Sequence, residues 1–211
     1  MDVAIEGRFA SYYDFFFSEV LKPIRLKNLE IISKHGCKNI IDLGCGTGSQ
    51  CRILSQHGFE VVGVDNSKNM IQVAMRKNTH RATFILSDIT KPIFLDQTFD
   101  CAIITLVLHP NDKKTITNIV EEAKRVTKKH GIIIITDYDY GRYITGKLAT
   151  IFIKFIESLA TSSHRKNYFE FMRRGALQTI LPKDKYYLLE SCSFYNNALK
   201  NLVVSKKNDL L

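Results

Sequence analysis

A glycine-rich segment, residues 42–48 (DLGCGTG), has the composition of a ligand-binding loop. It follows the β-branched run 38–43 and precedes a helix-compatible stretch, so it is expected to join a strand to a helix. Glycines let a ligand approach the backbone, and the helix that follows offers N–H groups and its positive dipole end. The acidic Asp42 suits a ligand's ammonium group and would lie poorly beside a pyrophosphate. The Gly-x-Gly-x-Gly spacing also departs from the Gly-x-Gly-x-x-Gly of nicotinamide-binding loops, which makes such a cofactor the weaker alternative.

Two further acids follow the next strand-like runs. Asp65 comes after residues 59–64 (FEVVGV) and 21 residues after Gly44, a spacing that suits a carboxylate accepting both hydroxyls of a ribose. Asp88 comes after residues 82–86 (ATFIL), where it would lie beside the base. Open α/β sheets bind ligands at the carboxyl ends of their strands, so the loop and the two acids predict one ligand site.

His109 is the best-placed candidate for a general base, because it follows the apolar run 99–108. A base is needed only where the acceptor must lose a proton, and a histidine can equally cap a strand for structural reasons. Both interpretations stay open at this point. Other side chains could reach the site, but we expect them to pack in the interior: Tyr138, Tyr140, His164 and Tyr168.

Strand-like runs alternate with helical stretches through the middle of the chain, which predicts βαβ units and a doubly wound, mostly parallel sheet of the α/β class. Strands are expected at 38–43, 59–64, 82–86, 99–108 and 132–135. Helices are expected at 68–77, with Ser67 as N-cap, and at 111–129.

The two ends of the chain carry other patterns. Apolar residues recur at helical spacing over 9–21, and Pro23 is expected to end that helix and start a second over 23–35. Towards the other end we expect helical stretches at 148–159 and 164–181, followed by an antiparallel pair of strands at 186–195 and 202–206 around the turn Asn196-Asn197.

Four of these segments together resemble the class I S-adenosylmethionine-dependent methyltransferases: 42–48 (DLGCGTG), 61–67 (VVGVDNS), 86–88 (LSD) and 99–109 (FDCAIITLVLH). Within the class the chain is similar to the methyltransferase type 11 group, which includes ubiquinone/menaquinone C-methyltransferases and phosphatidylethanolamine N-methyltransferases. The resemblance implies a seven-stranded sheet ordered 3-2-1-4-5-7-6 with an antiparallel last strand. It also implies a single domain with four parts: a helical cap (1–36), a cofactor-binding core (37–137), a helical insertion (138–185) and a closing hairpin and tail (186–211).

The resemblance implies S-adenosylmethionine as the cofactor and a role for each matching residue. The loop around the methionine portion would be formed by Asp42, Gly44, Cys45, Gly46 and Gly48. Asp65 would hold the ribose, and the adenine would be surrounded by Asn66, Met70, Ser87, Asp88 and Ile89. Thr105 and Leu106 would lie beneath the sulfonium, and Tyr13 would close over the cofactor, unless it belongs to an ordinary core stripe.

The acceptor is expected to be a small or lipid-like molecule, which receives the methyl group by in-line displacement. Residues 108–111 (LHPN) match neither the Asn/Asp-Pro-Pro-aromatic motif of base amino-methyltransferases nor the Pro-Cys of RNA cytosine C5 enzymes, so nucleic acid is less favoured. The opening residues 9–25 resemble the phospholipid and quinone group, and phenylalanines 15–17 beside basic residues could rest on an anionic membrane. The alternatives are a methyltransferase acting on RNA or protein, and a binding module without turnover.

Composition sets the remaining expectations. The net charge is +9, but basic pairs are spread along the chain, which favours solvated faces over a nucleic-acid patch. Five cysteines without a Cys-x-x-Cys pair argue against structural zinc and against a disulfide framework, and no metal is expected. The acidic start and the lack of a long apolar run predict a cytoplasmic protein. The sequence carries no signal for an oligomeric state.

Overall fold

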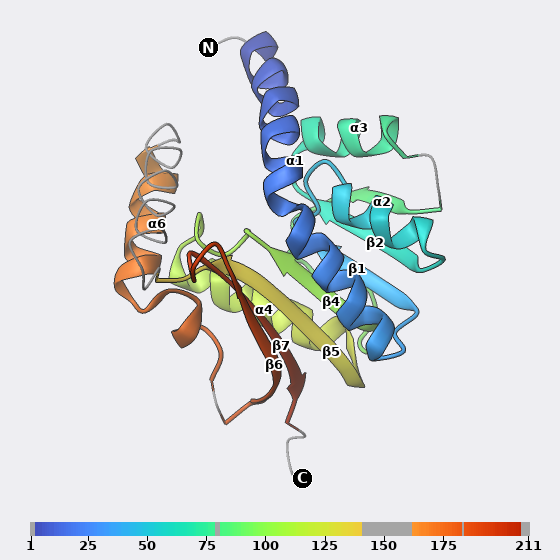
Figure 1. The fold of residues 1–211 in the computed structure, drawn as a ribbon, viewed down its shortest axis with the longest axis vertical. Helices are drawn as coiled ribbons and strands as arrows, with labels where there is room; N and C mark the ends of the chain where they lie inside the picture. Colours follow the sequence, from blue (N-terminus) through green and yellow to red (C-terminus); the bar gives the residue numbers. More distant parts are fainter. Residues whose placement is uncertain (1–2, 79–80, 141–161, 183, 208–211) are drawn as a thin grey trace. The chain divides into compact units, whose positions relative to one another are not determined.

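The structure of the protein is a computed structural model, which describes residues 3–78, 81–140, 162–182 and 184–207 (Figure 1). The chain divides into two compact units, residues 1–91 and 92–211.

A mixed sheet of seven strands has the order β3-β2-β1-β4-β5-β7-β6. The strands are β1 (Asn39–Leu43), β2 (Glu60–Asp65), β3 (Thr83–Leu86), β4 (Phe99–Thr105), β5 (Thr127–Tyr138), β6 (Tyr186–Phe194) and β7 (Leu199–Lys206). β7 is antiparallel to both β5 and β6, whereas the other described pairs are parallel. This arrangement confirms the α/β class and the strand order expected from the sequence.

The first unit places three helices around β1, β2 and β3: α1 (Val3–Lys34), α2 (Ser49–Gln56) and α3 (Lys68–Arg76). The helix α2 packs against β2, and α3 packs against β2 and β3. The expected cap of α3 is confirmed, because Ser67 Oγ accepts a hydrogen bond from Met70 N at 3.4 Å. Close packing explains Gly63 in β2, since a Cβ atom there would lie 2.8 Å from Cys45 Sγ.

The helix α1 runs without a break over Val3–Lys34, so the expected division at Pro23 is wrong. Proline removes one backbone donor and costs about 3 kcal/mol in a helix interior. Packing after Pro23 offsets that cost: Ile24 and Asn28 are fully buried, and Asn28 Nδ2 donates to Gln50 Oε1 of α2 at 3.1 Å. A local pattern does not contain this contact, because the two partners lie 22 residues apart.

In the second unit β5 is longer than the sequence predicts. The apolar run 132–135 lies at its centre, and pairing with β7 extends from Ile132 opposite Ser205 to Tyr138 opposite Leu199. The helix α4 (Lys113–Val126) packs against β4 and β5, and ends three residues before the expected boundary at 129 because Thr127 already pairs with Phe99 in the sheet.

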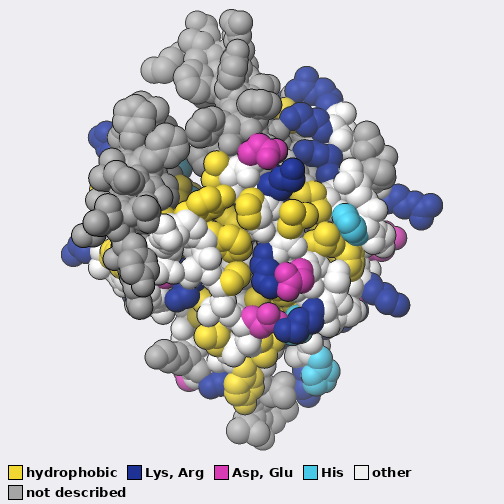
Figure 2. Space-filling view, in the orientation of Figure 1, with side chains coloured by type: hydrophobic (Ala, Val, Ile, Leu, Met, Phe, Trp, Pro, Cys, Tyr) yellow, Lys and Arg dark blue, Asp and Glu magenta, His cyan; other side chains and the backbone are white. Residues whose placement is uncertain are grey.

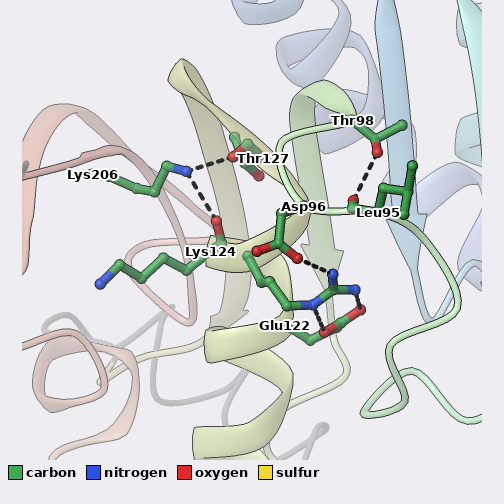
Figure 3. A network of polar contacts seen from close by, with 8 residues as sticks. Leu95, Asp96, Thr98, Glu122, Lys124, Thr127 and Lys206 are labelled. Carbon is green, nitrogen blue, oxygen red and sulfur yellow. Dashed lines mark hydrogen bonds and ion pairs between the residues drawn. The ribbon is translucent and has the colours of Figure 1, made fainter.

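Polar contacts tie the end of α4 to its neighbours (Figure 3). The Arg125 guanidinium donates to both carboxylate oxygens of Glu122 at 2.7 and 2.6 Å, and to Asp96 at 2.5 Å. Lys206 Nζ, at the end of β7, donates to the Thr127 carbonyl at 2.5 Å. A bidentate pair of this kind fixes geometry more firmly than single surface ion pairs do.

The C-terminal elements follow the sequence pattern in part. The expected helix over 164–181 is divided into α6 (Ser162–Arg173) and the short 3-10 helix η1 (Ala176–Thr179), with Gly175 at φ +106° between them. The turn between β6 and β7 is confirmed, because Tyr195, Asn196 and Asn197 all have positive φ. The helical stripe expected at 148–159 lies outside the described residues.

Charge is distributed rather than concentrated on the face drawn in Figure 2. Lys and Arg side chains occur on all sides of this face, with Asp and Glu side chains between them. No helix within the described residues combines the length and the apolar character that crossing a bilayer requires.

Candidate functional site

The glycine loop joins β1 to α2 through left-handed backbone at three positions. Gly44, Gly46 and Gly48 have φ values of +81°, +54° and +74°. The N–H groups of Gly44 and Cys45 donate to the Val64 carbonyl at 2.8 and 3.0 Å, which fastens the loop to the end of β2. Residues with side chains rarely adopt these φ values, so the glycines are required by the backbone itself.

Two of these glycines face different surroundings. A Cβ atom at Gly48 would lie 2.6 Å from the Phe84 ring of β3, so close packing also excludes a side chain there. A Cβ atom at Gly46 would meet no described atom within 4 Å. The backbone at Gly46 therefore borders open space, as a loop that receives a ligand requires.

Asp65, the last residue of β2, links the glycine loop to the start of α3. Its Oδ2 accepts a hydrogen bond from Gly46 N at 2.8 Å, and its Oδ1 accepts one from Ser67 N at 2.8 Å. Each carboxylate oxygen has a second lone-pair direction, so the half-buried group can accept further donors. Two adjacent hydroxyl groups are donors of the right kind.

Asp42 lies beneath the loop on β1 and is 2% exposed. Its Oδ2 accepts a hydrogen bond from the Cys51 thiol at 3.4 Å. Burial raises the pKa of Asp42 to about 7, and the nearby Asp65 carboxylate adds to the rise, whereas Cys51 and Arg25 oppose it. A buried carboxyl group in this state favours a cationic partner, because a positive charge would stabilise its ionised form.

The cysteines of this region belong to the interior. Cys45 and Cys51 share a hydrogen bond, which lowers the pKa of Cys45 and raises that of Cys51. Burial and the Asp42 charge raise both, so that the pKa of each thiol lies above its usual value. Thiols of this kind stay protonated at neutral pH and serve as packing groups.

The end of β3 lies beside the end of β2, since Ser87 N donates to the Asp65 carbonyl at 3.0 Å. Asp88 accepts hydrogen bonds from Thr90 N at 2.9 Å and from Thr90 Oγ1 at 2.8 Å, and these bonds lower the pKa of the exposed Asp88 carboxyl. The structure thus places Asp65, Ser87 and Asp88 at neighbouring strand ends. The residues assigned to the adenine differ in exposure: half-buried Met70, Ser87 and Ile89, and exposed Asn66 and Asp88.

In the second unit the chain turns sharply after β4. Leu106 has φ +56°, and its N–H donates to the Thr136 carbonyl of β5 at 2.8 Å. Within the described part of the chain, the buried hydroxyl of Thr105 has no hydrogen-bond partner. A buried polar atom without a hydrogen-bond partner costs free energy, so such atoms are few in folded proteins.

His109 follows this turn and pairs with Asp137 of β5. His109 Nδ1 lies 2.8 Å from Asp137 Oδ1, and the two residues are 4% and 0% exposed. The sequence pattern did not identify Asp137, although an acid at the end of the fifth strand is a signal of the same kind as Asp65 and Asp88.

Aromatic rings surround the His109 imidazole. The ring centroids of Tyr138, His164, Tyr168 and Phe171 lie 4.5, 5.5, 6.2 and 6.5 Å from that of His109. Tyr138 and Tyr168 therefore pack in the interior as expected, and both are buried. The same expectation is wrong for Tyr140, which is 47% exposed and whose hydroxyl donates to the Met172 carbonyl.

One expected site residue is not part of this geometry. Tyr13 belongs to α1, but its side chain lies outside the described residues. No group of three His, Cys, Asp or Glu side chains in the described ranges could hold a metal ion.

Comparison with known proteins gives matches to methyltransferases. The family model described as "Methyltransferase domain" matches residues 41–135. The demethylmenaquinone methyltransferase of Tropheryma whipplei (strain Twist) is 23% identical over 169 residues, covering 78% of this chain and 70% of that protein.

Two solved structures share the fold. The plantazolicin methyltransferase BpumL in complex with SAH has a TM-score of 0.65 at 16% identity, covering 95% and 90% of the two chains. The magnesium protoporphyrin IX methyltransferase (ChlM) of Synechocystis PCC 6803 has a TM-score of 0.61 at 17% identity, covering 88% and 83%.

The matched segment contains the glycine loop, Asp65, Asp88 and the turn after β4. Together with the strand order of the sheet, it assigns the chain to the class I S-adenosylmethionine-dependent methyltransferases. The chain is an enzyme of that class, and the two solved structures that share its fold each hold SAH.

Proposed function

We propose that this enzyme transfers a methyl group from S-adenosylmethionine to a small-molecule or lipid-like acceptor. The observation that carries the proposal is the position of Asp65. Its carboxylate joins the glycine loop to α3 through Gly46 N and Ser67 N, and retains acceptor capacity for a ribose.

The residues of the first unit fit the donor in three respects. The open space beside Gly46 can receive the amino-acid portion, and the buried Asp42 suits an ammonium group. Asp65 suits the ribose hydroxyls, and the strand-end residues of β3 suit the base. In this proposal the donor is held by the residues assigned from the sequence: Asp42, Gly44, Cys45, Gly46, Gly48, Asp65, Asn66, Met70, Ser87, Asp88 and Ile89, with Tyr13, Thr105 and Leu106 completing the set.

When bound, S-adenosylmethionine supplies a methyl group that its sulfonium charge has already activated. The protein's main task is therefore to align the acceptor, and alignment can lower a barrier by about 7–11 kcal/mol. Where the acceptor must lose a proton, we assign the general base to His109, whose pairing with Asp137 holds its ring in place.

A quinol-type molecule is the first acceptor to test. Support comes from the similarity to the demethylmenaquinone methyltransferase. The cytoplasm is the proposed location, as the sequence suggests.

Contact with an anionic membrane stays a proposal with little support. On α1, Lys27 Nζ lies 2.6 Å from Glu30 and Lys22 Nζ lies 3.8 Å from Glu19. These acids reduce the positive charge that the helix would offer to a lipid surface.

The first experiment is a binding measurement. S-adenosylhomocysteine at one hundred times its dissociation constant should stabilise the protein by roughly 2.7 kcal/mol in thermal unfolding, whereas NAD should not. Asp65→Asn should lower the affinity for this ligand by about ten- to a hundredfold, because one carboxylate oxygen is replaced by an amide NH₂ donor. Asp112→Asn is the matched control, since the exposed Asp112 only caps α4 and asparagine caps equally well.

A second experiment identifies the acceptor. Tritium-labelled S-adenosylmethionine is incubated with the enzyme and with separated small-molecule, lipid, RNA and protein fractions. Label in the small-molecule or lipid fraction supports the proposal, whereas label confined to RNA or protein would overturn it.

A further inference from the structure

Arg52, in the first turn of α2, reaches back to the end of the glycine loop. Its Nη1 donates to the Thr47 carbonyl at 2.6 Å, and its Nη2 donates to Ser49 Oγ at 2.8 Å. These two acceptors belong to the residues on either side of Gly48. Because the guanidinium group is planar and rigid, the two hydrogen bonds together restrict the backbone at this glycine.

Helix preferences do not explain an arginine at this position. A positive charge in the first turn opposes the helix dipole, whose positive end lies there. Gly48 is the N-cap of α2 at φ +74° and offers no side chain to the first N–H groups of the helix. The start of α2 therefore depends on other contacts, and the two hydrogen bonds of Arg52 are among them.

The glycine loop is thus fastened near both of its ends. Near the beginning, Gly44 N donates to the Val64 carbonyl of β2 at 2.8 Å. Near the end, Arg52 holds the Thr47 carbonyl. Gly46 lies between these two attachments and borders the open space in which we place the donor.

Fastening matters because a loop with three glycines is costly to order. Glycine has more backbone freedom than any other residue, so a ligand that orders such a loop loses part of its binding free energy. Contacts that order the loop in the free protein remove this loss beforehand. Hydrogen bonds from an ionised donor are stronger than those between neutral groups, so an arginine is suited to this task.

We infer that Arg52 is a positioning residue for donor binding: its guanidinium group keeps the backbone around Gly48 in the conformation that receives S-adenosylmethionine. The inference rests on the proposed function insofar as the donor binds at this loop. Arg52 acts through the Thr47 carbonyl and the Ser49 hydroxyl, and we assign it no contact with the donor itself.

The first test measures affinity for S-adenosylhomocysteine by calorimetric titration of the folded protein. Arg52→Met removes both hydrogen bonds and retains a long side chain, and should lower the affinity by about tenfold. Arg76→Met is the matched control, since exposed Arg76 of α3 donates only to the Gln72 carbonyl, at 3.3 Å. The control should keep the affinity within about twofold.

Arg52→Lys distinguishes the paired hydrogen bonds from the positive charge. Lysine retains the charge, but its single nitrogen does not reproduce the planar guanidinium group. The affinity of Arg52→Lys should be at least about threefold below that of wild type. Wild-type affinity in this variant would overturn the inference, because the charge alone would then suffice.

Ser49→Ala tests whether Arg52 acts through its acceptors. It should lower the affinity of the wild-type protein by about threefold and have no further effect in Arg52→Met, because the shared hydrogen bond is already lost. Additive losses of affinity would show that the two residues act separately, which contradicts the inference.

Amide hydrogen exchange in the donor-free protein measures the order of the loop directly. Gly48 N donates to the Cys45 carbonyl at 3.0 Å, and its amide should exchange at least about tenfold faster in Arg52→Met. The Gly44 amide, near the beginning of the loop, is the internal reference and should exchange within about threefold of its wild-type rate. Equal acceleration of both amides would assign Arg52 to overall stability and refute its role in the loop.

The outcomes distinguish this inference from the proposed function. A wild-type protein that does not bind S-adenosylhomocysteine would overturn the donor site, and this inference with it. A wild-type protein that binds the ligand, together with an Arg52→Met variant that binds it equally well, would overturn the inference alone.

Discussion

The Cys51 thiol donates a hydrogen bond to the buried carboxyl group of Asp42, with Sγ and Oδ2 3.4 Å apart. A neutral thiol compensates a carboxylate only weakly, so the contact leaves Asp42 short of the positive charge that its ionised form would need. We therefore expect the protonation state of Asp42 to affect both the stability of the protein and the binding of the donor.

Asp42 should make the free energy of unfolding depend on pH. Its pKa is about 7 in the folded protein, against an ordinary value of 3.8. The folded state therefore binds more protons than the unfolded state, and this group's contribution to stability falls as pH rises from about 4 to 7. The full pKa difference between the folded and the unfolded state corresponds to a loss of about 4 kcal/mol in the free energy of unfolding. Urea unfolding of wild type and Asp42→Asn between pH 4 and 8 measures it.

Asparagine does not titrate, so Asp42→Asn should lose this part of the pH dependence. Asp112→Asn, at an exposed helix cap, should retain it. If the free energy of unfolding changes equally with pH in wild type and in Asp42→Asn, Asp42 does not contribute to the pH dependence of stability.

Donor binding should release a proton near pH 7. A bound ammonium group stabilises the ionised form of Asp42, which is about half protonated at that pH in the unliganded protein. Calorimetric titration with S-adenosylhomocysteine in phosphate and in Tris measures the release, since the two buffers take up protons with different enthalpies. We expect about 0.5 proton per ligand for wild type and none for Asp42→Asn. Identical enthalpies in both buffers would exclude the coupling.

Gly46 and Gly48 should respond differently to alanine. Gly48→Ala places a Cβ atom 2.6 Å from the Phe84 ring at φ +74°, and should cost about 2–4 kcal/mol of stability. Gly46→Ala meets open space at φ +54°, and should cost only about 1 kcal/mol.

The affinity for S-adenosylhomocysteine should show the opposite order: Gly46→Ala should lose more affinity than Gly48→Ala. The affinity is measured on the folded fraction of each variant. The Cβ atom at Gly46 occupies space that we assign to the donor, so the affinity for S-adenosylhomocysteine should fall at least about tenfold. If Gly46→Ala binds as tightly as wild type, the donor does not lie against this residue.

Much of the fold, and the gathering of the glycine loop with the acids at the strand ends, can be predicted from the sequence, because both depend on local patterns. The loop 42–48 and the acids Asp65 and Asp88 each follow an apolar run, and the parallel sheet brings such strand ends together. The pairing of His109 with Asp137 could not be predicted, because it joins residues 28 apart through a turn whose φ at Leu106 no local motif reveals.

The continuity of α1 through Pro23 could not be predicted for a similar reason. The local rule for Pro23 is sound, but burial of Ile24 and the contact between Asn28 and Gln50 compensate the missing backbone donor. The burial of Asp42 likewise depends on α2 and β2, which supply Cys51 and Asp65 around it.

His109→Gln should separate catalysis from donor binding. Glutamine retains polar atoms but cannot accept a proton at neutral pH, so kcat should fall by about 10²–10⁴-fold where the acceptor must be deprotonated. The affinity for S-adenosylhomocysteine should stay within threefold, because we assign the donor to other residues. His130→Gln, at an exposed position of β5, is the matched control and should leave kcat unchanged. Tritium transfer under single-turnover conditions measures the chemical step itself, so a slow product release cannot hide the effect. Unchanged single-turnover rates in His109→Gln would remove the imidazole from the reaction and leave its pairing with Asp137 as a purely structural contact.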